Sequence, residues 1–226
     1  AIENKMKQLL DSPPVVELPE NVEILRNISW LKGIPEDTFK KMSAYFTKRV
    51  FAVGEALFKE SKSGNSIYVI VRGNVKITLG DELLSLLGPG DIIGEIAVLT
   101  NQTSLATVEA ESPVTTLRIK YLKIQRLLVE CPTLAKNTWD IAGRRIAENQ
   151  LASQPPYNRM SEKKRRRVLG KGRVLHYTAD TNFTLQAKDA VLVSGKLAAQ
   201  EQEIEGSCIL APKAYKSLKD TYIFVI

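Results

Sequence analysis

Short apolar runs separated by glycine dominate the chain between Arg49 and Ile119. Each run is too short for a stable helix, and several short strands with turn residues between them are typical of an antiparallel sandwich or barrel. We therefore expect a jelly-roll-like β-domain in this part of the chain. The expected strands are Val50–Val53, Ala56–Phe58, Ser66–Val71, Val75–Leu79, Leu83–Leu87, Thr107–Ala110 and Val114–Ile119.

Helical patterns flank this region on both sides. Apolar residues at helical spacing predict a helix over residues 21–31, and Pro35 opens a second one that runs through Phe46. After the strands, the same spacing predicts helices over Leu122–Val129 and Pro132–Leu151. Residues 1–20 are polar and interrupted by prolines, so we expect them to form a lead-in segment.

The last part of the chain, residues 173–226, again has short strand-like runs. We expect six strands there, and the pattern of Val191–Leu197 resembles that of Val69–Val75, but any hairpin produces one such match. The segment has no Gly-Glu turn, so it predicts a small all-β domain without a ligand site. The expected strands are Arg173–Tyr177, Phe183–Gln186, Ala190–Val193, Lys196–Ala199, Cys208–Ala211 and Tyr222–Ile226.

The formal net charge of +7 is concentrated in one short segment. Between Arg159 and Arg173 the chain has eight basic residues and one acid, Glu162. We interpret residues 152–172 as a basic linker between a first domain, residues 21–151, and the small β-domain. The segment is either a solvated connector or a contact for anionic lipid or an acidic protein surface. Its central basic residues are Lys163, Lys164, Arg165, Arg166 and Arg167.

Several functional classes are disfavoured by what the sequence lacks. The chain has one histidine, His176, and two distant cysteines, Cys131 and Cys208, which are too few to form the ligand set of a zinc ion. We also expect the protein to occur in a reducing compartment. There is no serine elbow or P-loop, so we expect no enzyme and no cofactor. No recognition helix follows Leu151, and the charge is not spread over a folded face, so we expect no nucleic-acid partner. No apolar run approaches 18 residues, which predicts a soluble piece of a larger protein.

The run from Gly94 to Val108 is the candidate binding turn. A glycine before a short helical turn lets the backbone N–H groups of Ile96, Ala97 and Val98 face outward, and a helix N-terminus favours a phosphodiester. The hydroxyl groups of Ser104 and Thr107 are further donors. The candidate ligand-binding residues are Gly94, Glu95, Ile96, Ala97, Val98, Ser104, Leu105, Ala106 and Thr107.

Three ordered motifs, Phe51–Phe58, Ile67–Ile77 and Leu87–Ala97, resemble the cyclic-nucleotide-binding domain shared by protein kinase A regulatory subunits, pacemaker channels and bacterial catabolite activators. The resemblance covers residues 21–151. It implies that Glu95 binds the ribose 2′-hydroxyl and that an arginine pairs with the cyclic phosphate. Ser104 stands where that arginine is expected, so either binding is weak, with cAMP favoured over cGMP, or the fold is kept as an interaction domain without a ligand.

The order of a nucleotide-binding domain and a compact β-extension is similar to the cytoplasmic end of the sperm-specific sodium/proton exchangers of the solute carrier nine C group. This resemblance implies a regulatory module on the cytoplasmic side of the plasma membrane, in a flagellum. It also implies that the rest of a membrane exchanger is the partner and that the full-length protein is a homo-oligomer.

Overall fold

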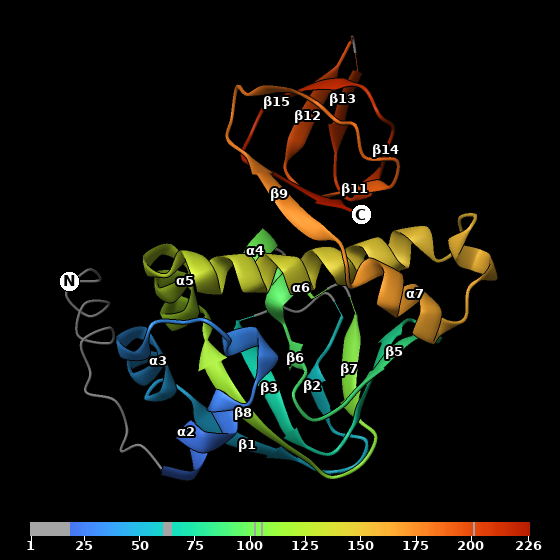
Figure 1. Ribbon diagram of the computed structural model, residues 1–226. Helices are drawn as coiled ribbons and strands as arrows, with labels where there is room; N and C mark the ends of the chain where they lie inside the picture. Colours follow the sequence, from blue (N-terminus) through green and yellow to red (C-terminus); the bar gives the residue numbers. More distant parts are fainter. Residues whose placement is uncertain (1–18, 61–64, 102, 105, 201) are drawn as a thin grey trace. The chain divides into compact units, whose positions relative to one another are not determined.

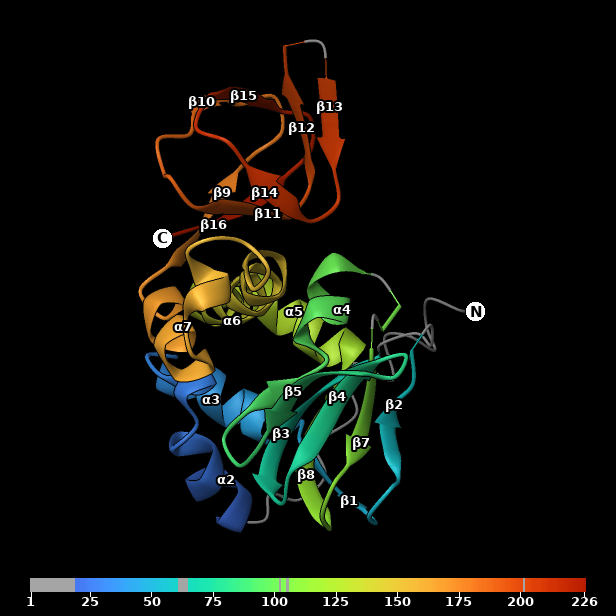
Figure 2. The ribbon, with the colours of Figure 1, turned by 90° about the vertical axis from the view of Figure 1, so that its right-hand side faces the viewer.

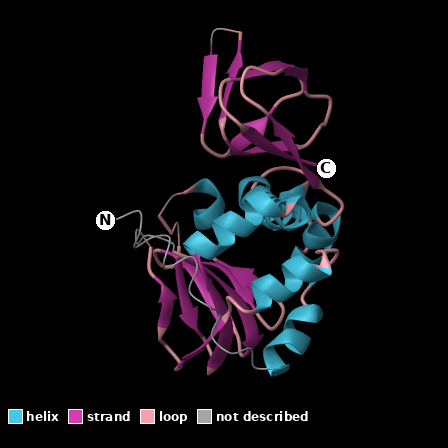
Figure 3. Ribbon diagram, turned by 90° about the vertical axis from the view of Figure 1, so that its left-hand side faces the viewer, coloured by secondary structure: helices cyan, strands magenta, loops and turns pink. Residues whose placement is uncertain are grey.

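The computed structural model describes residues 19–60, 65–101, 103–104, 106–200 and 202–226. The chain divides into two compact units, residues 1–137 and 138–226. The division lies inside a helix, α6 (Pro132–Leu151), whereas we predicted from the sequence that the first domain ends after this helix, at residue 151. Both units contain strands with helices beside them (Figure 3). The predicted mainly-β class with a jelly-roll domain and flanking helices is confirmed.

The helix expected over residues 21–31 is broken in two. Helix α2 spans Pro19–Arg26, and a 3-10 turn, η1, spans Ser29–Leu31. The break follows Asn27, whose side-chain amide donates to the carbonyl of Glu23 at 3.1 Å and so competes with the helical pattern. Helix α3 (Glu36–Ser43) follows, and Glu36 forms an ion pair with Arg26 at 2.6 Å. The lead-in up to residue 18 lies outside the described residues.

Eight strands form the first barrel. One sheet has the order β1-β8-β3-β6 and the other the order β2-β7-β4-β5 (Figures 1 and 2). A short helix, α4 (Glu95–Thr100), connects β6 to β7. The strands are β1 (Thr47–Phe51), β2 (Ala56–Phe58), β3 (Ser66–Arg72), β4 (Val75–Leu79), β5 (Glu82–Leu87), β6 (Ile92–Ile93), β7 (Thr107–Ala110) and β8 (Val114–Lys120).

The first expected strand is displaced. We expected it at Val50–Val53, but β1 begins at Thr47, and the side chains of Val50 and Val53 are both 64% exposed. The sequence also missed β6, because two residues are too few to give a pattern. The other six expected strands differ from the observed ones by at most one residue at each end.

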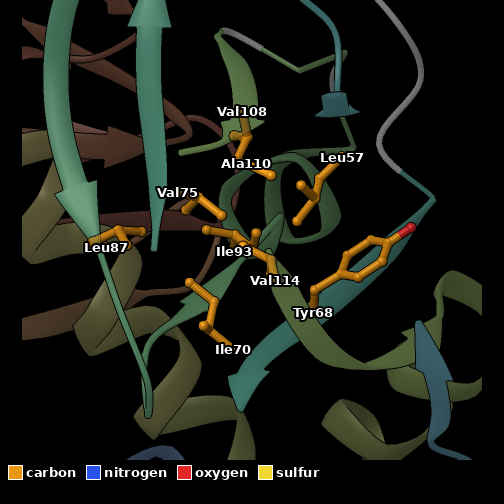
Figure 4. Packing of buried hydrophobic residues seen from close by; sticks show 9 residues of the cluster. All are labelled: Leu57, Tyr68, Ile70, Val75, Leu87, Ile93, Val108, Ala110 and Val114. Carbon is orange, nitrogen blue, oxygen red and sulfur yellow. The ribbon is translucent and has the colours of Figure 1, made fainter. Parts of the chain in front are cut away.

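The space between the two sheets is filled by apolar side chains from β2 to β8. Tyr68 packs edge-to-face against Phe58, with ring centroids 5.1 Å apart, and this geometry is favourable for aromatic pairs. Because alternate residues of β3 face opposite sides, Ile67 and Val69 are fully buried on the other face of the sheet. Figure 4 shows the interior cluster, which consists of Leu57, Tyr68, Ile70, Val75, Leu87, Ile93, Val108, Ala110 and Val114.

Helix α5 (Tyr121–Glu130) follows β8 and leads into α6. Ion pairs of 2.6 Å join Glu130 of α5 to Lys41 of α3 and to Arg126. In the first half of α6, the amide of Asn137 donates to the carbonyl oxygens of Trp30 and Lys32, at 2.8 and 3.0 Å. These contacts fix the first half of α6 to the N-terminal helical segment of the first unit.

The second unit contains a second eight-stranded barrel, where the sequence predicted six strands. The two missed strands are β13, a polar edge strand of sequence Gln-Glu-Ile-Glu, and β15, in which only Tyr215 and Ser217 are buried. Neither has the apolar run on which the prediction depended. The strands are β9 (Arg173–Tyr177), β10 (Asn182–Thr184), β11 (Ala190–Ser194), β12 (Lys196–Ala199), β13 (Gln202–Glu205), β14 (Cys208–Leu210), β15 (Ala214–Ser217) and β16 (Thr221–Val225).

The second barrel repeats the topology of the first. Its sheets have the orders β9-β16-β11-β14 and β10-β15-β12-β13, which are the orders of the first barrel with each strand number raised by eight. Gly73 and Gly195 occupy equivalent positions in the two barrels. Each has a positive φ, and a Cβ would collide with the carbonyl of the residue before β8 in the case of Gly73, or before β16 in the case of Gly195. A register shift also precedes each glycine, between Ile70 and Arg72 and between Leu192 and Ser194. The weak pattern match noted in the sequence therefore reflects a repeated fold.

The second half of α6 packs within the second unit. The backbone N–H of Val174 donates to the carboxylate of Asp140 at 3.0 Å. The ring of Trp139 stacks on Tyr222 at 3.6 Å between centroids, and His176 stacks on the other side of Tyr222 at 4.5 Å. One helix is thus an integral part of both units.

The segment assigned to a basic linker, residues 152–172, contains helical structure. A 3-10 turn, η2, spans Tyr157–Arg159, and helix α7 spans Glu162–Leu169. Ser161 caps α7, because its hydroxyl accepts a hydrogen bond from the backbone N–H of Lys164 at 3.4 Å. Tyr157 is 2% exposed, and its hydroxyl donates to the carboxylate of Asp189 at 2.9 Å.

Tyr157 predicts a loss of stability in alkali. Burial, followed by the hydrogen bond to Asp189, raises its pKa from 10.0 to about 12. Between these values the unfolded chain releases the proton that the folded chain keeps, so the free energy of unfolding is unaffected below pH 10 and falls above it, by up to about 2–3 kcal/mol. Urea unfolding from pH 8 to pH 11.5 tests this. At pH 8 the free energy of unfolding of Tyr157→Phe should be lower than that of the wild type, and the difference between the two proteins should shrink above pH 10. A deficit independent of pH would contradict this assignment.

Candidate functional site

The connection between β6 and β7 begins at Gly94. Its φ of 92° is in the left-handed region, and a Cβ would lie 2.9 Å from Cζ of Phe58 and closer still to the carbonyl oxygen of Ser66. Only glycine fits both the conformation and the space. The residue therefore turns the chain directly from β6 into α4 (Figure 1).

The first backbone N–H groups of helix α4 are not used by the helix itself. Its first helical hydrogen bond runs from the N–H of Val98 to the carbonyl of Gly94 at 3.2 Å, so the three preceding N–H groups have no acceptor within the helix. Ala97 and Val98 are buried, and Ile96 is half-buried. Of the three donors proposed from the sequence, those of Ile96 and Ala97 lack a helical acceptor, whereas that of Val98 is used by the helix.

Glu95, in the first turn of α4, is buried with only 2% of its surface exposed. A carboxylate at a helix N-terminus is stabilised by the helix dipole. A buried carboxylate can accept hydrogen bonds from hydroxyl groups, and such bonds to charged groups are stronger than those between neutral groups. Glu95 is therefore suited to bind a polyol such as a ribose.

Ser104 and Thr107 lie on the far side of the same connection. The hydroxyl of Ser104 donates to the carbonyl of Ala106 at 2.8 Å, so its one proton is used locally. The hydroxyl of Thr107 accepts from the backbone N–H of Glu60 at 3.2 Å and keeps its own proton for another acceptor. Leu105 lies outside the described residues. This side of the turn offers neutral donors and no guanidinium.

Two residues that the sequence did not indicate hold α4 in place. The amide of Gln125 on α5 donates to the carbonyl of Val98 at 2.7 Å, and the hydroxyl of Tyr121 donates to the side-chain oxygen of Asn101 at 3.2 Å. Both partners lie more than fifteen residues away in the chain and belong to no motif, so only the fold brings them to α4. The candidate turn is thus joined to the helices that follow the barrel.

The second barrel has no counterpart of this turn. Residues 94–106 connect β6 to β7, whereas residues 211–213 connect the equivalent strands β14 and β15. Ala211 follows β14 where Gly94 follows β6. The basic residues Lys163 to Arg167 also belong to the second unit, on α7.

The described residues contain no group of three or more histidine, cysteine or acidic side chains placed to hold a metal ion. Within the same residues, no helix combines the length and apolar character needed to cross a bilayer.

Comparisons with known proteins agree with this fold. Residues 48–131 match the family described as cyclic nucleotide-binding domain. The chain is 30% identical over 125 residues to the cyclic AMP receptor protein of Thermus thermophilus, which covers 52% of this chain and 56% of that protein. It is 28% identical over 93 residues to human cGMP-dependent protein kinase 2, which covers 38% of this chain and 12% of the kinase. The chain therefore spans about half, or much less, of these relatives.

Two solved structures resemble both barrels. A cAMP-bound PfPKA-R has a TM-score of 0.51 at 16% identity, over 93% of this chain and 82% of that one. The regulatory subunit of a cAMP-independent protein kinase A from Trypanosoma brucei has a TM-score of 0.53 at 8% identity, over 96% and 87%. At these identities the likeness concerns the fold alone. Residues 48–131 are therefore similar in sequence to the cyclic nucleotide-binding domain, and the solved structures share the fold of the chain.

Proposed function

We propose that the first barrel binds a cyclic nucleotide weakly, with cAMP favoured over cGMP, and that the chain is a regulatory module. The observation that carries this proposal is the retained Gly94–Glu95 turn: a glycine that no other residue can replace, followed by a buried carboxylate at the start of α4. The preference for cAMP is supported by the sequence similarity to the cyclic AMP receptor protein reported above.

In this proposal the ligand contacts are divided between two sides of the turn. Glu95 accepts a hydrogen bond from the ribose, and the free N–H groups of Ile96 and Ala97, with the hydroxyl of Thr107, donate to the phosphate. No arginine lies between residues 94 and 108. A charged, bidentate donor contributes about 1.5–3 kcal/mol to such a contact, so its absence weakens binding roughly tenfold to a hundredfold.

A second candidate is a domain that keeps the fold for assembly and binds no nucleotide. The local hydrogen bond of Ser104 to Ala106 favours it, because that hydroxyl cannot donate to a phosphate without leaving its present acceptor. The second barrel also supports it, because it has the same topology with only residues 211–213 between β14 and β15.

We further propose that the chain is the cytoplasmic regulatory part of a sperm-type sodium/proton exchanger. The order of a nucleotide-binding domain followed by a compact β-domain supports this, together with the motifs in residues 51–97. Cross-linking of the full-length exchanger in membranes tests it: lysines of this chain should be linked to the cytoplasmic face of the transporter.

Titration calorimetry with cAMP and with cGMP tests the ligand proposal. We expect a single site per chain, because only the first barrel has the turn, and stronger binding of cAMP. Glu95→Gln, which keeps the shape of the side chain, should weaken binding at least tenfold, whereas the exposed Glu111→Gln should bind as the wild type does. No heat at millimolar ligand from a folded protein would exclude the ligand proposal and favour the assembly domain.

A further inference from the structure

Helix α7 presents one continuous basic face. At about 100° per residue, Arg165 and Leu169 lie on one side of the helix, and Lys163, Lys164 and Arg167 lie on the opposite side. Leu169 is fully buried and Arg165 is half-buried, while Lys163, Lys164 and Arg167 are exposed. The sequence of α7 therefore separates a packed side from a charged outer side.

This basic face is held on a folded element. Arg165 lies 3.6 Å from the carboxylate of Glu148 on α6, and Leu169 is part of the core. The chain enters α7 from the buried Tyr157 and leaves it through Gly172 into β9, where a Cβ on Gly172 would collide with Phe224. The backbone positions of these residues are therefore fixed relative to one another, so little backbone entropy is lost when the side chains contact a surface.

Most of these charges are not neutralised within the chain. Arg166 forms an ion pair with Glu162 at 2.6 Å, and Arg165 and Arg166 approach Glu148. Over the part of the chain that the structure describes, the remaining six basic residues of the segment form no ion pair. They are Arg159, Lys163, Lys164, Arg167, Lys171 and Arg173.

The outer side of α7 also lacks the groups that other anionic partners require. Protein interfaces usually have an apolar centre. Among the described residues, the large exposed apolar side chains lie in other segments of the chain, and the one valine of α7, Val168, is half-buried. Single-stranded nucleic acids stack on exposed aromatic rings, and the nearest preceding ring, Tyr157, is buried. A plane of negative headgroups needs neither feature.

We propose that the outer side of α7, formed by Lys163, Lys164 and Arg167 with Lys171 beyond its end, docks on an anionic phospholipid surface. The contact is electrostatic and does not insert into the bilayer. It involves no residue of the β6–β7 turn, so vesicle binding can be tested separately from nucleotide binding.

Co-sedimentation with phosphatidylcholine vesicles, with and without phosphatidylserine, tests this proposal. The full chain should bind only the vesicles that contain phosphatidylserine, and binding at about 0.1 M salt should be lost at about 1 M. Each basic residue near such a surface strengthens binding about fivefold, so the triple substitution K163Q/K164Q/R167Q should weaken it about a hundredfold.

A matched control removes the same charge from scattered exposed positions. K40Q/K48Q/K188Q should bind the vesicles within a few-fold of the wild type, because these three lysines do not share a surface element. Equal weakening by both triple substitutions would overturn the proposal, since net charge alone would then explain binding. Failure to bind phosphatidylserine, together with binding of a single-stranded oligonucleotide that depends on α7, would also overturn it and assign the face to nucleic acid.

Discussion

Replacement of Gly94 by alanine should destabilise the first barrel by about 2–5 kcal/mol and abolish any nucleotide binding. A left-handed conformation costs a non-glycine residue about 1–2 kcal/mol. At Gly94 the added Cβ also collides with the backbone of Ser66 and with Phe58, and such overpacking costs about 1–3 kcal/mol more. Urea unfolding followed by tryptophan fluorescence, and calorimetry with cAMP, would measure the two effects.

Gly90 provides the control for this substitution. It has the same φ of 92°, but no atom lies within 4 Å of the position that a Cβ would occupy. Gly90→Ala should therefore show only the backbone cost, about 1–2 kcal/mol, and should retain the ligand affinity of the wild type. Equal destabilisation by the two substitutions would show that the close approach of Gly94 to Ser66 has no energetic effect.

Replacement of Ser104 by arginine should tighten cAMP binding tenfold to a hundredfold. The substitution adds a positively charged, bidentate donor on the phosphate side of the turn and removes a hydroxyl that is bonded to Ala106. Calorimetry would measure the change, and the dissociation constant of Ser104→Arg should rise more steeply with salt than that of the wild type.

Thr103→Arg adds the same charge at the neighbouring exposed residue. It should tighten binding by less than threefold, because charge alone, without the correct position, has only a screened effect in water. If Ser104→Arg binds no more tightly than the wild type, the turn does not hold its ligand in the proposed way.

The sequence predicted the strands whose two faces are both buried, such as β3, because they combine an apolar run with glycine at the end. It failed at β13, where a polar edge strand has no such pattern, and at Asn27, where a side-chain hydrogen bond breaks the helix. The glycine and the carboxylate of the candidate turn were predictable because their roles depend on local backbone geometry. The contacts of Gln125 and Tyr121 were not, since they depend on how α5 packs against α4.

The repeated barrel was hardly visible in the sequence, for a physical reason. Strand order and register are determined by the alternation of buried and exposed positions, which many residues satisfy. Only positions with an unusual backbone, such as Gly73 and Gly195, require the same residue in both copies. Two barrels can therefore share one topology while their side chains differ almost everywhere.

The contacts of helix α6 restrict where the chain can be divided. Its twenty residues extend over about 30 Å. The side chain of Asn137 is hydrogen-bonded within the first unit, and that of Asp140, less than one helical turn later, is hydrogen-bonded within the second. A fragment that ends at residue 151 would keep Trp139 and Asp140 but would lack Tyr222 and Val174. The ring of Trp139 would then lose its stacking partner, so the end of the helix is a poor place to divide the chain.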